Sequence, residues 1–182
     1  MPRNFIPWWR GWGFSKGSGI MKLTKELVGL SAEYAVACAL CRRNIYAQLT
    51  LGNRKRTDIL IETDKGMARI QVKGKTGPDW PRCKGIFRKN DFLVFVDFKN
   101  KSVDERSDFY ILNVDDWIKL LEKEIRSTSN FDEGYVTIDE ENVPIWKGGN
   151  GSLIEGHNIT PKMIVEHEGG WDKIKKRVGE TE

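Results

Sequence analysis

Residues 92–98 read Phe-Leu-Val-Phe-Val-Asp-Phe, a run that is apolar at every position except one. A strand with one face in water alternates apolar and polar residues, whereas a strand covered on both faces is apolar throughout. This run therefore predicts a central strand that is buried on both faces of a sheet. Any fold proposed for the chain has to supply a covering layer on each side of it.

The segments around this run predict an α/β fold with a mixed central β-sheet flanked by helices. Further strands are predicted at 45–51, 58–63, 67–74 and 109–114. The turn Asp64-Lys65-Gly66 joins the second and third of these as a hairpin. Beyond residue 127 the patterns are weaker, and they indicate a short strand at 135–138, a helix from Thr160-Pro161 to about His167, and a basic helix at 171–178.

One long helix is predicted over residues 23–43, with Thr24 as a suitable N-cap and Asn44 as a left-handed residue at its end. Its apolar residues recur at three- and four-residue steps, so we expect them to form a stripe that faces the core. The stripe consists of Leu27, Leu30, Tyr34, Ala37, Cys38 and Cys41. A second helix is predicted after Asp115 or Asp116, with an apolar face of Trp117, Leu120, Leu121 and Ile125.

Composition excludes several classes of protein. The chain has 182 residues, 39% of them apolar and 31% charged, which is typical of one globular domain with an appendage. No apolar run approaches the ~20 residues of a membrane span. Three cysteines and two histidines argue against a disulfide framework and a multi-histidine metal site. A reducing, cytoplasmic location and no membrane partner are therefore expected, and Cys38-x-x-Cys41 is interpreted as core rather than zinc-binding.

The chain divides into three parts. Residues 1–21 are an irregular N-terminal extension, rich in aromatic and glycine residues, with no period and no signal-peptide pattern. An alternative is an aromatic and basic arm that stacks on exposed bases. Residues 22–126 form the core domain, and residues 127–182 form a C-terminal extension that packs on it.

Charge is distributed unevenly along the sequence. Residues 1–60 hold ten basic and three acidic residues, a net charge of +7, whereas residues 131–182 hold six and eleven, a net charge of −5. The densest basic segment, residues 54–89, has eleven basic residues against four acidic ones. A solvated surface is the ordinary explanation. Because this excess surrounds the polar hairpin described next, it favours a partner with a phosphate backbone.

The hairpin gathers three polar side chains. Gln71 and Lys73 share one face of their strand because side chains alternate. If Asp64 and Lys65 are the loop residues, Asp58 lies across from Gln71; if the loop is Lys65-Gly66, it lies across from Lys73. Either register brings the three within neighbouring-pair reach, ~5–8 Å between side-chain bases.

Such a trio suits metal-assisted phosphodiester chemistry. A carboxylate and an amide oxygen are hard ligands of the kind that Mg²⁺ accepts, and Mn²⁺ is an alternative. A metal-bound water is more easily deprotonated and can attack phosphorus. A lysine on the same face can orient that water or balance phosphoryl charge.

The order of elements, with Glu33 on the first helix, Asp58 after a basic loop and then Gln71-Val72-Lys73, resembles the PD-(D/E)XK nuclease superfamily, the restriction-endonuclease-like fold. Thr57 stands where that motif has proline, and Gln71 stands where it has an acid. The stretches Gly29-x-x-x-Glu33 and LGNRKRTD…IQVK are similar to a Gln-x-Lys subset that includes a group I intron homing endonuclease.

The resemblance implies a Mg²⁺-dependent DNA endonuclease with Asp58 as main metal ligand and Gln71 as a neutral second ligand. Lys73 would orient water or phosphate, and Glu33 would be a supporting carboxylate that reaches the metal through water. Double-strand cleavage with one site per chain would need a homodimer or a higher homo-oligomer. The alternative is a catalytically inactive DNA-binding module on the same fold, because Gln71 removes one anionic ligand.

Basic residues on both sides of the hairpin are the expected DNA contacts. They are Arg54, Lys55, Arg56, Lys75, Arg82, Lys84, Arg88 and Lys89, joined by Trp80, which could pack on a sugar or base. The alternative for the loop at 75–91 is a solvated connection in which Trp80 covers the core.

Overall fold

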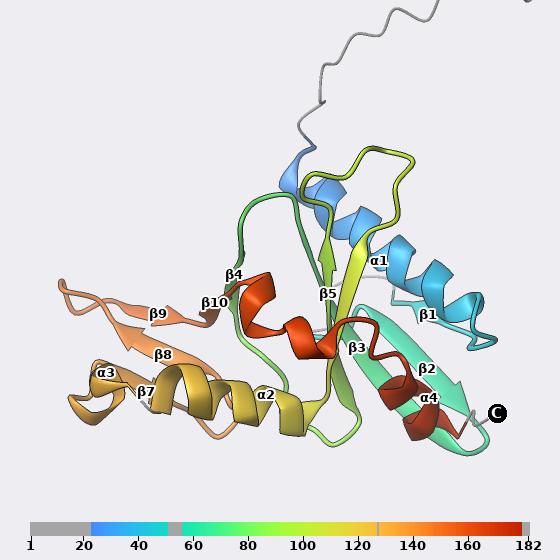
Figure 1. The fold of residues 1–182 in the computed structure, drawn as a ribbon. Coiled ribbons are helices and arrows are strands. Elements are labelled where there is room, and N and C mark those ends of the chain that lie inside the picture. The colour runs from blue at the N-terminus through green and yellow to red at the C-terminus, as the bar shows by residue number, and fades with distance from the viewer. Residues whose placement is uncertain (1–22, 51–55, 127, 180–182) are drawn as a thin grey trace, which may run out of the picture.

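A computed structural model describes residues 23–50, 56–126 and 128–179, and its centre is a five-stranded sheet in the order β1-β2-β3-β5-β6 (Figure 1). The strands are β1 (Gln48–Leu49), β2 (Ile59–Thr63), β3 (Gly66–Lys75), β5 (Asp91–Asp97) and β6 (Asp108–Leu112). β3 and β5 pair in parallel and the other neighbours are antiparallel, so the sheet is mixed. The predicted α/β fold class is confirmed.

The central run behaves as its sequence predicts. Residues 92–97 are all buried in β5, between β3 and β6. Phe92, Val94 and Val96 point into one hydrophobic cluster, and Leu93 and Phe95 point into a second cluster on the opposite face. The alternation of a strand thus divides the core into two layers that share the sheet.

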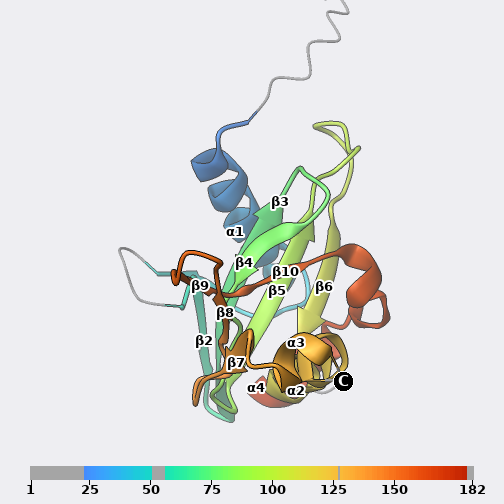
Figure 2. The same cartoon turned by 90° about the vertical axis from the view of Figure 1, so that its left-hand side faces the viewer.

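Helices cover both faces of the sheet (Figures 1 and 2). The helices α1 (Lys25–Cys41) and α4 (Asp172–Val178) pack in the first cluster, and α2 (Val114–Leu121) packs in the second. The π-helical turn Glu122–Arg126 continues α2 and buries Ile125 in the same cluster.

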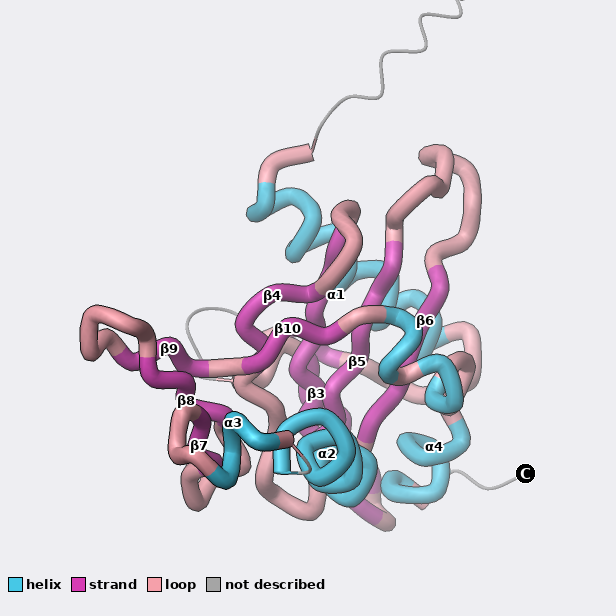
Figure 3. Tube along the Cα trace, turned by 60° about the vertical axis from the view of Figure 1, so that its left-hand side comes forward, coloured by secondary structure: helices cyan, strands magenta, loops and turns pink. Residues whose placement is uncertain are grey.

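The rest of the chain forms two small sheets beside the main one (Figure 3). One pairs β4 (Trp80–Cys83) with β10 (His157–Ile159), and the other consists of β7 (Val136–Ile138), β8 (Pro144–Lys147) and β9 (Leu153–Glu155). This part of the chain also contains short helical segments, which are α3 (Ser129–Asp132) and two 3-10 turns, Pro161–Met163 and Val165–His167. Residues 136–178 contribute to both core clusters, while the domain boundaries at 21 and 126 stay predictions.

The first helix begins as predicted but presents another face to the core. The Thr24 hydroxyl accepts a hydrogen bond from Leu27 N at 3.3 Å, and Asn44 is left-handed with φ 62°. The buried residues are instead Val28, Ala32, Val36, Ala39 and Leu40. The predicted stripe is wrong as a core face, since Leu27, Leu30 and Tyr34 are 48%, 46% and 58% exposed, and Cys38 and Cys41 are exposed as well.

Other boundaries differ in detail. The strand predicted at 45–51 is only Gln48–Leu49 among the described residues. The N-cap of α2 is Asn113, not an aspartate, because Asn113 and Asp116 form a reciprocal capping box. The helix predicted after Thr160-Pro161 is a pair of 3-10 turns.

Candidate functional site

The candidate site forms where β2 begins and the edge of β3 becomes free. β2 pairs with β3 from Thr63 opposite Gly66 to Ile59 opposite Ile70, which is the register that places Asp58 across from Gln71. Asp58 N donates the last bond of this ladder, to Ile70 O at 2.8 Å. The Asp58 carboxylate then accepts from Val72 N at 2.6 Å and so takes the place of a strand carbonyl. This bond fixes the carboxylate at the edge of β3.

Gln71 and Lys73 lie together on one face of β3. The buried Gln71 carboxamide lies 3.3 Å from Gly85 O on one side and 3.3 Å from Lys73 Nζ on the other. Both contacts are satisfied when its nitrogen donates to Gly85 O and its oxygen accepts from Lys73. The amide oxygen therefore faces the half-buried ammonium group.

Gly85 itself is held by close packing. Its φ is +77°, and a Cβ there would lie 2.0 Å from the Trp117 ring, so only glycine fits. The loop that orients Gln71 is thus anchored against the second core cluster.

Glu33 reaches the site from α1. The helix approaches β3 so closely that a Cβ on Gly74 would lie 2.8 Å from Val28 O and 2.7 Å from the Ala32 Cβ. Burial, and then the negative charge of Asp58, raise the pKa of Glu33, while Lys73 lowers it. The four predicted catalytic residues therefore belong to one electrostatic cluster.

Both carboxylates of the cluster have raised pKa values. Burial raises the pKa of Asp58, and the hydrogen bond from Val72 N and the charge of Lys73 only partly offset this. Two carboxylates with raised pKa values are more easily ionised when a positive charge lies between them. Within the described residues no three His, Cys, Asp or Glu side chains gather to hold a metal, so the donors would be Asp58, Glu33 and the Gln71 amide oxygen. This set of hard oxygens fits Mg²⁺ or Mn²⁺.

Two predicted DNA contacts are wrong. Lys75 is 4% exposed; its ammonium pairs with Asp97 at 2.6 Å, donates to Gly77 O at 3.1 Å and lies over the Trp80 ring. Trp80 is 1% exposed and donates to Val96 O at 3.3 Å, so it covers the core, as the alternative had it. Neither side chain is free to meet a phosphate or a base, because the β4 segment folds back over β3.

The remaining basic residues that the structure describes have different partners. Arg56 pairs with Glu141 at 2.9 Å and Lys84 pairs with Glu155. Arg88 stacks on the Phe87 ring, with 4.9 Å between the guanidinium carbon and the ring centroid. Arg82 and Lys89 are exposed. The predicted contacts Arg54 and Lys55 lie outside the described residues.

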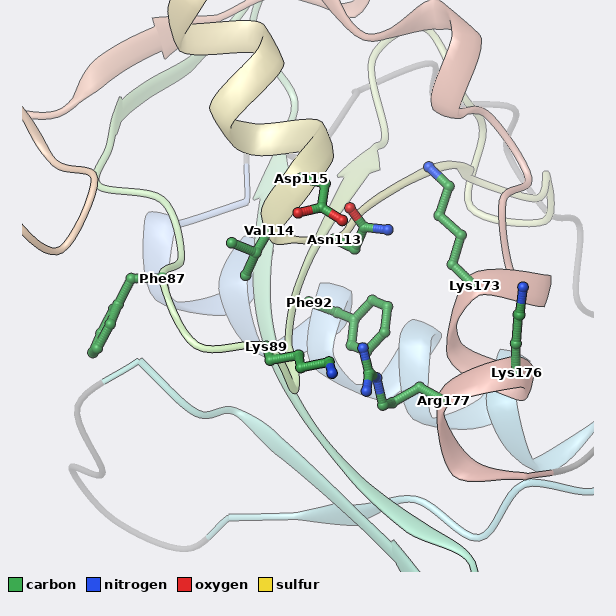
Figure 4. A pocket seen from close by; sticks show the side chains of 9 residues that line it. All are labelled: Phe87, Lys89, Phe92, Asn113, Val114, Asp115, Lys173, Lys176 and Arg177. Carbon is green, nitrogen blue, oxygen red and sulfur yellow. The ribbon is translucent and has the colours of Figure 1, made fainter.

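Two cavities lie side by side and share Phe87. One, of about 560 Å³, is lined by Thr57, the residue before Asp58, by the cations Arg56, Arg69, Lys84 and Arg88, and by the acids Asp91, Glu141 and Glu155. The other, of about 690 Å³, lies between the start of α2 and α4, where Lys89 and Arg177 extend towards Phe92 (Figure 4).

Four cations that line these cavities are not among the site residues predicted from the sequence. Arg69 shares the face of Gln71 by strand alternation, which is a signal that could have revealed it, although it pairs with Asp91 at 2.8 Å. Lys176 and Arg177 come from α4, and only the tertiary structure brings them beside Lys89. Lys173 lines the same cavity, but its ammonium group is held by Asp116, Ile111 O and His167.

Comparisons with known proteins find a likeness among solved structures. No protein-family model and no curated protein match the chain. Among solved structures, a bacterial homing endonuclease, I-Ssp6803I, is similar, with 23% sequence identity and a TM-score of 0.37. The match covers 51% of this chain and 71% of that one.

Within the described ranges, no helix combines the length and the apolar character needed to cross a bilayer.

Proposed function

We propose that this protein is a divalent-metal-dependent DNA endonuclease that hydrolyses phosphodiester bonds. The observation that supports this most is the cluster of Asp58, Glu33, Gln71 and Lys73 at the free edge of β3. Groups with pKa values raised by burial and by a neighbouring like charge are typical of sites that await a ligand. A basic surface beside the cluster would supply the phosphate contacts.

Each residue has a separate role in this proposal. Asp58, held by Val72 N, and the Gln71 amide oxygen would bind Mg²⁺ or Mn²⁺, and Glu33 would support them. When bound, the ion would make a water molecule easier to deprotonate and would screen phosphodiester charge. Lys73 would stabilise the negative charge that builds on the phosphoryl oxygens as the bond from the water oxygen to phosphorus forms and the bond to the leaving sugar oxygen breaks.

The substrate backbone would follow the two cavities. Lys84 and its partner Glu155 are both exposed, and such a pair contributes little to stability. Lys84 can therefore exchange this partner for a phosphate at small cost. Lys89, Lys176 and Arg177 would continue the contact beyond Phe87.

Cleavage of plasmid and branched DNA with Mg²⁺ or Mn²⁺ tests the proposal. We expect nicking by the wild type and none by Asp58→Asn, whose amide keeps the side-chain shape but removes the charge. A matched control is Asp104→Asn, because Asp104 is an exposed aspartate in the β5–β6 loop. Loss of activity in the control as well would contradict the assigned role of Asp58.

A DNA-binding module without catalysis is the second candidate. It is favoured by the neutral Gln71, which leaves only two carboxylates for a metal. It predicts that the wild type retards DNA in a gel but cleaves none of the substrates with either metal. Gln71→Glu would restore the missing anionic ligand, and cleavage by that variant alone would decide for this candidate.

A further inference from the structure

The exposed face of α1 is an apolar stripe with no partner among the described residues. Leu27, Leu30 and Tyr34 are 46–58% exposed, and the exposed Cys38 and Cys41 continue the row. Their three- and four-residue spacing places them in one line along the helix, opposite the buried Val28, Ala32, Val36 and Ala39. We refer to these five residues as the α1 stripe.

Such a face is unusual for a helix at a surface. The outer face of a helix that borders solvent is ordinarily charged. Here the charged residues of α1 are Lys25, Glu26 and Glu33, and helical spacing places all three outside the α1 stripe. Contiguous exposed apolar rows of this kind mark interaction sites.

We propose that the α1 stripe is the surface through which two copies of this chain associate, with the two α1 helices antiparallel. Position 34 is the centre of the row, and an antiparallel pair centred there brings residues whose numbers sum to 68 to the same level. Leu27 then lies level with Cys41 of the partner subunit, and Leu30 lies level with Cys38 of the partner subunit. The two tyrosines meet at the two-fold axis.

This arrangement matches large side chains with small ones. The N-terminal half of the α1 stripe carries leucines, whereas the C-terminal half carries cysteines. A parallel pair would place leucine against leucine at one end and cysteine against cysteine at the other, which leaves the latter underpacked. Only the antiparallel pair fills both ends equally, and this self-complementarity points to a second copy as the occupant.

The antiparallel pairing also determines on which side of the dimer the two candidate sites lie, an inference that rests on the proposed function. The two-fold axis of an antiparallel pair is perpendicular to both helices, so one flank of α1 lies on the same side of the dimer in both copies. Glu33 lies on such a flank, next to the α1 stripe. The two sites would thus open on one side, where one duplex can reach both.

The size of the contact sets its strength. α1 has 17 residues and is therefore about 25 Å long. A pair of such helices buries less than the roughly 1,600 Å² of a standard interface. We therefore expect a dimer that dissociates at concentrations on the order of micromolar.

Sedimentation of the full chain tests the association. The wild type should be dimeric at about 100 µM, and Leu30→Lys with Tyr34→Lys should weaken the dimer roughly 100-fold. Leu153→Lys is the matched control, because Leu153 is exposed on β9, away from α1. A thermal midpoint measured for each variant verifies that it is folded. A wild type that stays monomeric, or a dimer that survives the double change, would overturn the proposal.

Cross-linking tests the orientation. In a Cys38→Ser background, Leu27→Cys should form an intermolecular disulfide between position 27 and Cys41 of the partner subunit under mild oxidation, identified by peptide mapping. Links that join only identical positions would overturn the antiparallel arrangement. The endonuclease proposal is judged separately. A dimer that cleaves no DNA would contradict the endonuclease proposal but not the α1 interface. Cleavage by a strict monomer would contradict the interface but not the endonuclease proposal.

Discussion

Lys73 and Lys75 lie two residues apart on the same face of β3, yet their surroundings differ completely. Lys75 is 4% exposed and is matched by one carboxylate, Asp97, and one aromatic ring, Trp80. Lys73 is half-buried, contacts the Gln71 amide, and has no ion pair within 4.0 Å to any described carboxylate. Its electrostatic neighbours, Asp58 and Glu33, are held at the strand edge and on α1.

This difference separates a structural charge from a candidate functional one. The charges of a buried ion pair are already compensated, so they do not bind a ligand. Removing either partner leaves the other as an unpaired buried charge. Charges that are gathered but not matched remain available to a substrate or an ion. The same substitution should therefore lower activity at Lys73 and stability at Lys75.

The largest expected effect is on activity, from Lys73→Met. This change keeps the length of the side chain but removes the charge that would stabilise the phosphoryl oxygens. DNA cleavage should fall about 10³-fold, because removing one such electrostatic donor typically costs 10²–10³ in rate. Its thermal midpoint should stay near that of the wild type. Plasmid nicking under single-turnover conditions measures the cleavage rate, and calorimetry measures the thermal midpoint.

Lys75→Met is the matched change and should act on stability instead. It leaves Asp97 buried without its cation, which typically costs about 3–5 kcal/mol in the free energy of unfolding. Urea denaturation measures this loss. Lys75→Met combined with Asp97→Leu should recover much of it, since no charge is then stranded. If Lys75→Met were as stable as the wild type, the pair would have no structural role.

A divalent ion bound by Asp58, Gln71 and Glu33, beside Lys73, should stabilise the folded chain. The buried pair of Lys75 and Asp97 should have no part in this effect. At 100 times its dissociation constant, Mg²⁺ or Mn²⁺ should raise the unfolding free energy of the wild type by about 2.7 kcal/mol. Asp58→Asn should remove this gain, whereas Asp104→Asn should keep it. Thermal unfolding with increasing metal concentration gives the comparison, and an equal gain in both variants would place the ion elsewhere.

The smallest effect is the pH dependence of stability without metal. Because burial raises the pKa values of Asp58 and Glu33, the folded state holds these protons more tightly than the unfolded state. Their contribution to stability is therefore lost as pH rises from the ordinary carboxyl pKa through the raised one. Asp58→Asn should be more stable than the wild type at neutral pH, and the advantage should disappear in acid. Urea denaturation at a series of pH values measures it.

Local patterns predicted much of the frame of the molecule. The apolar run at 92–98 became the buried strand β5, and Asp64-Lys65 became the two-residue turn that sets the register of Asp58 and Gln71. These features follow from alternation and turn chemistry, which act between residues close in sequence. The roles given to Glu33, Asp58, Gln71 and Lys73 stay predictions, although the structure brings the four residues together.

Contacts between distant segments decided the rest. Both faces of α1 are apolar, so periodicity could not tell which one would be buried; the close approach to Gly74 of β3 selected the face with Val28 and Ala32. Likewise, Lys75 is a surface cation by sequence and a buried one by structure, because Asp97 lies beside it on the neighbouring strand. The sequence by itself determined the long strands β2, β3, β5 and β6 and their alternation, since these depend on neighbouring residues. Only the tertiary structure decided which apolar face and which charges became the interior, since burial depends on what packs opposite.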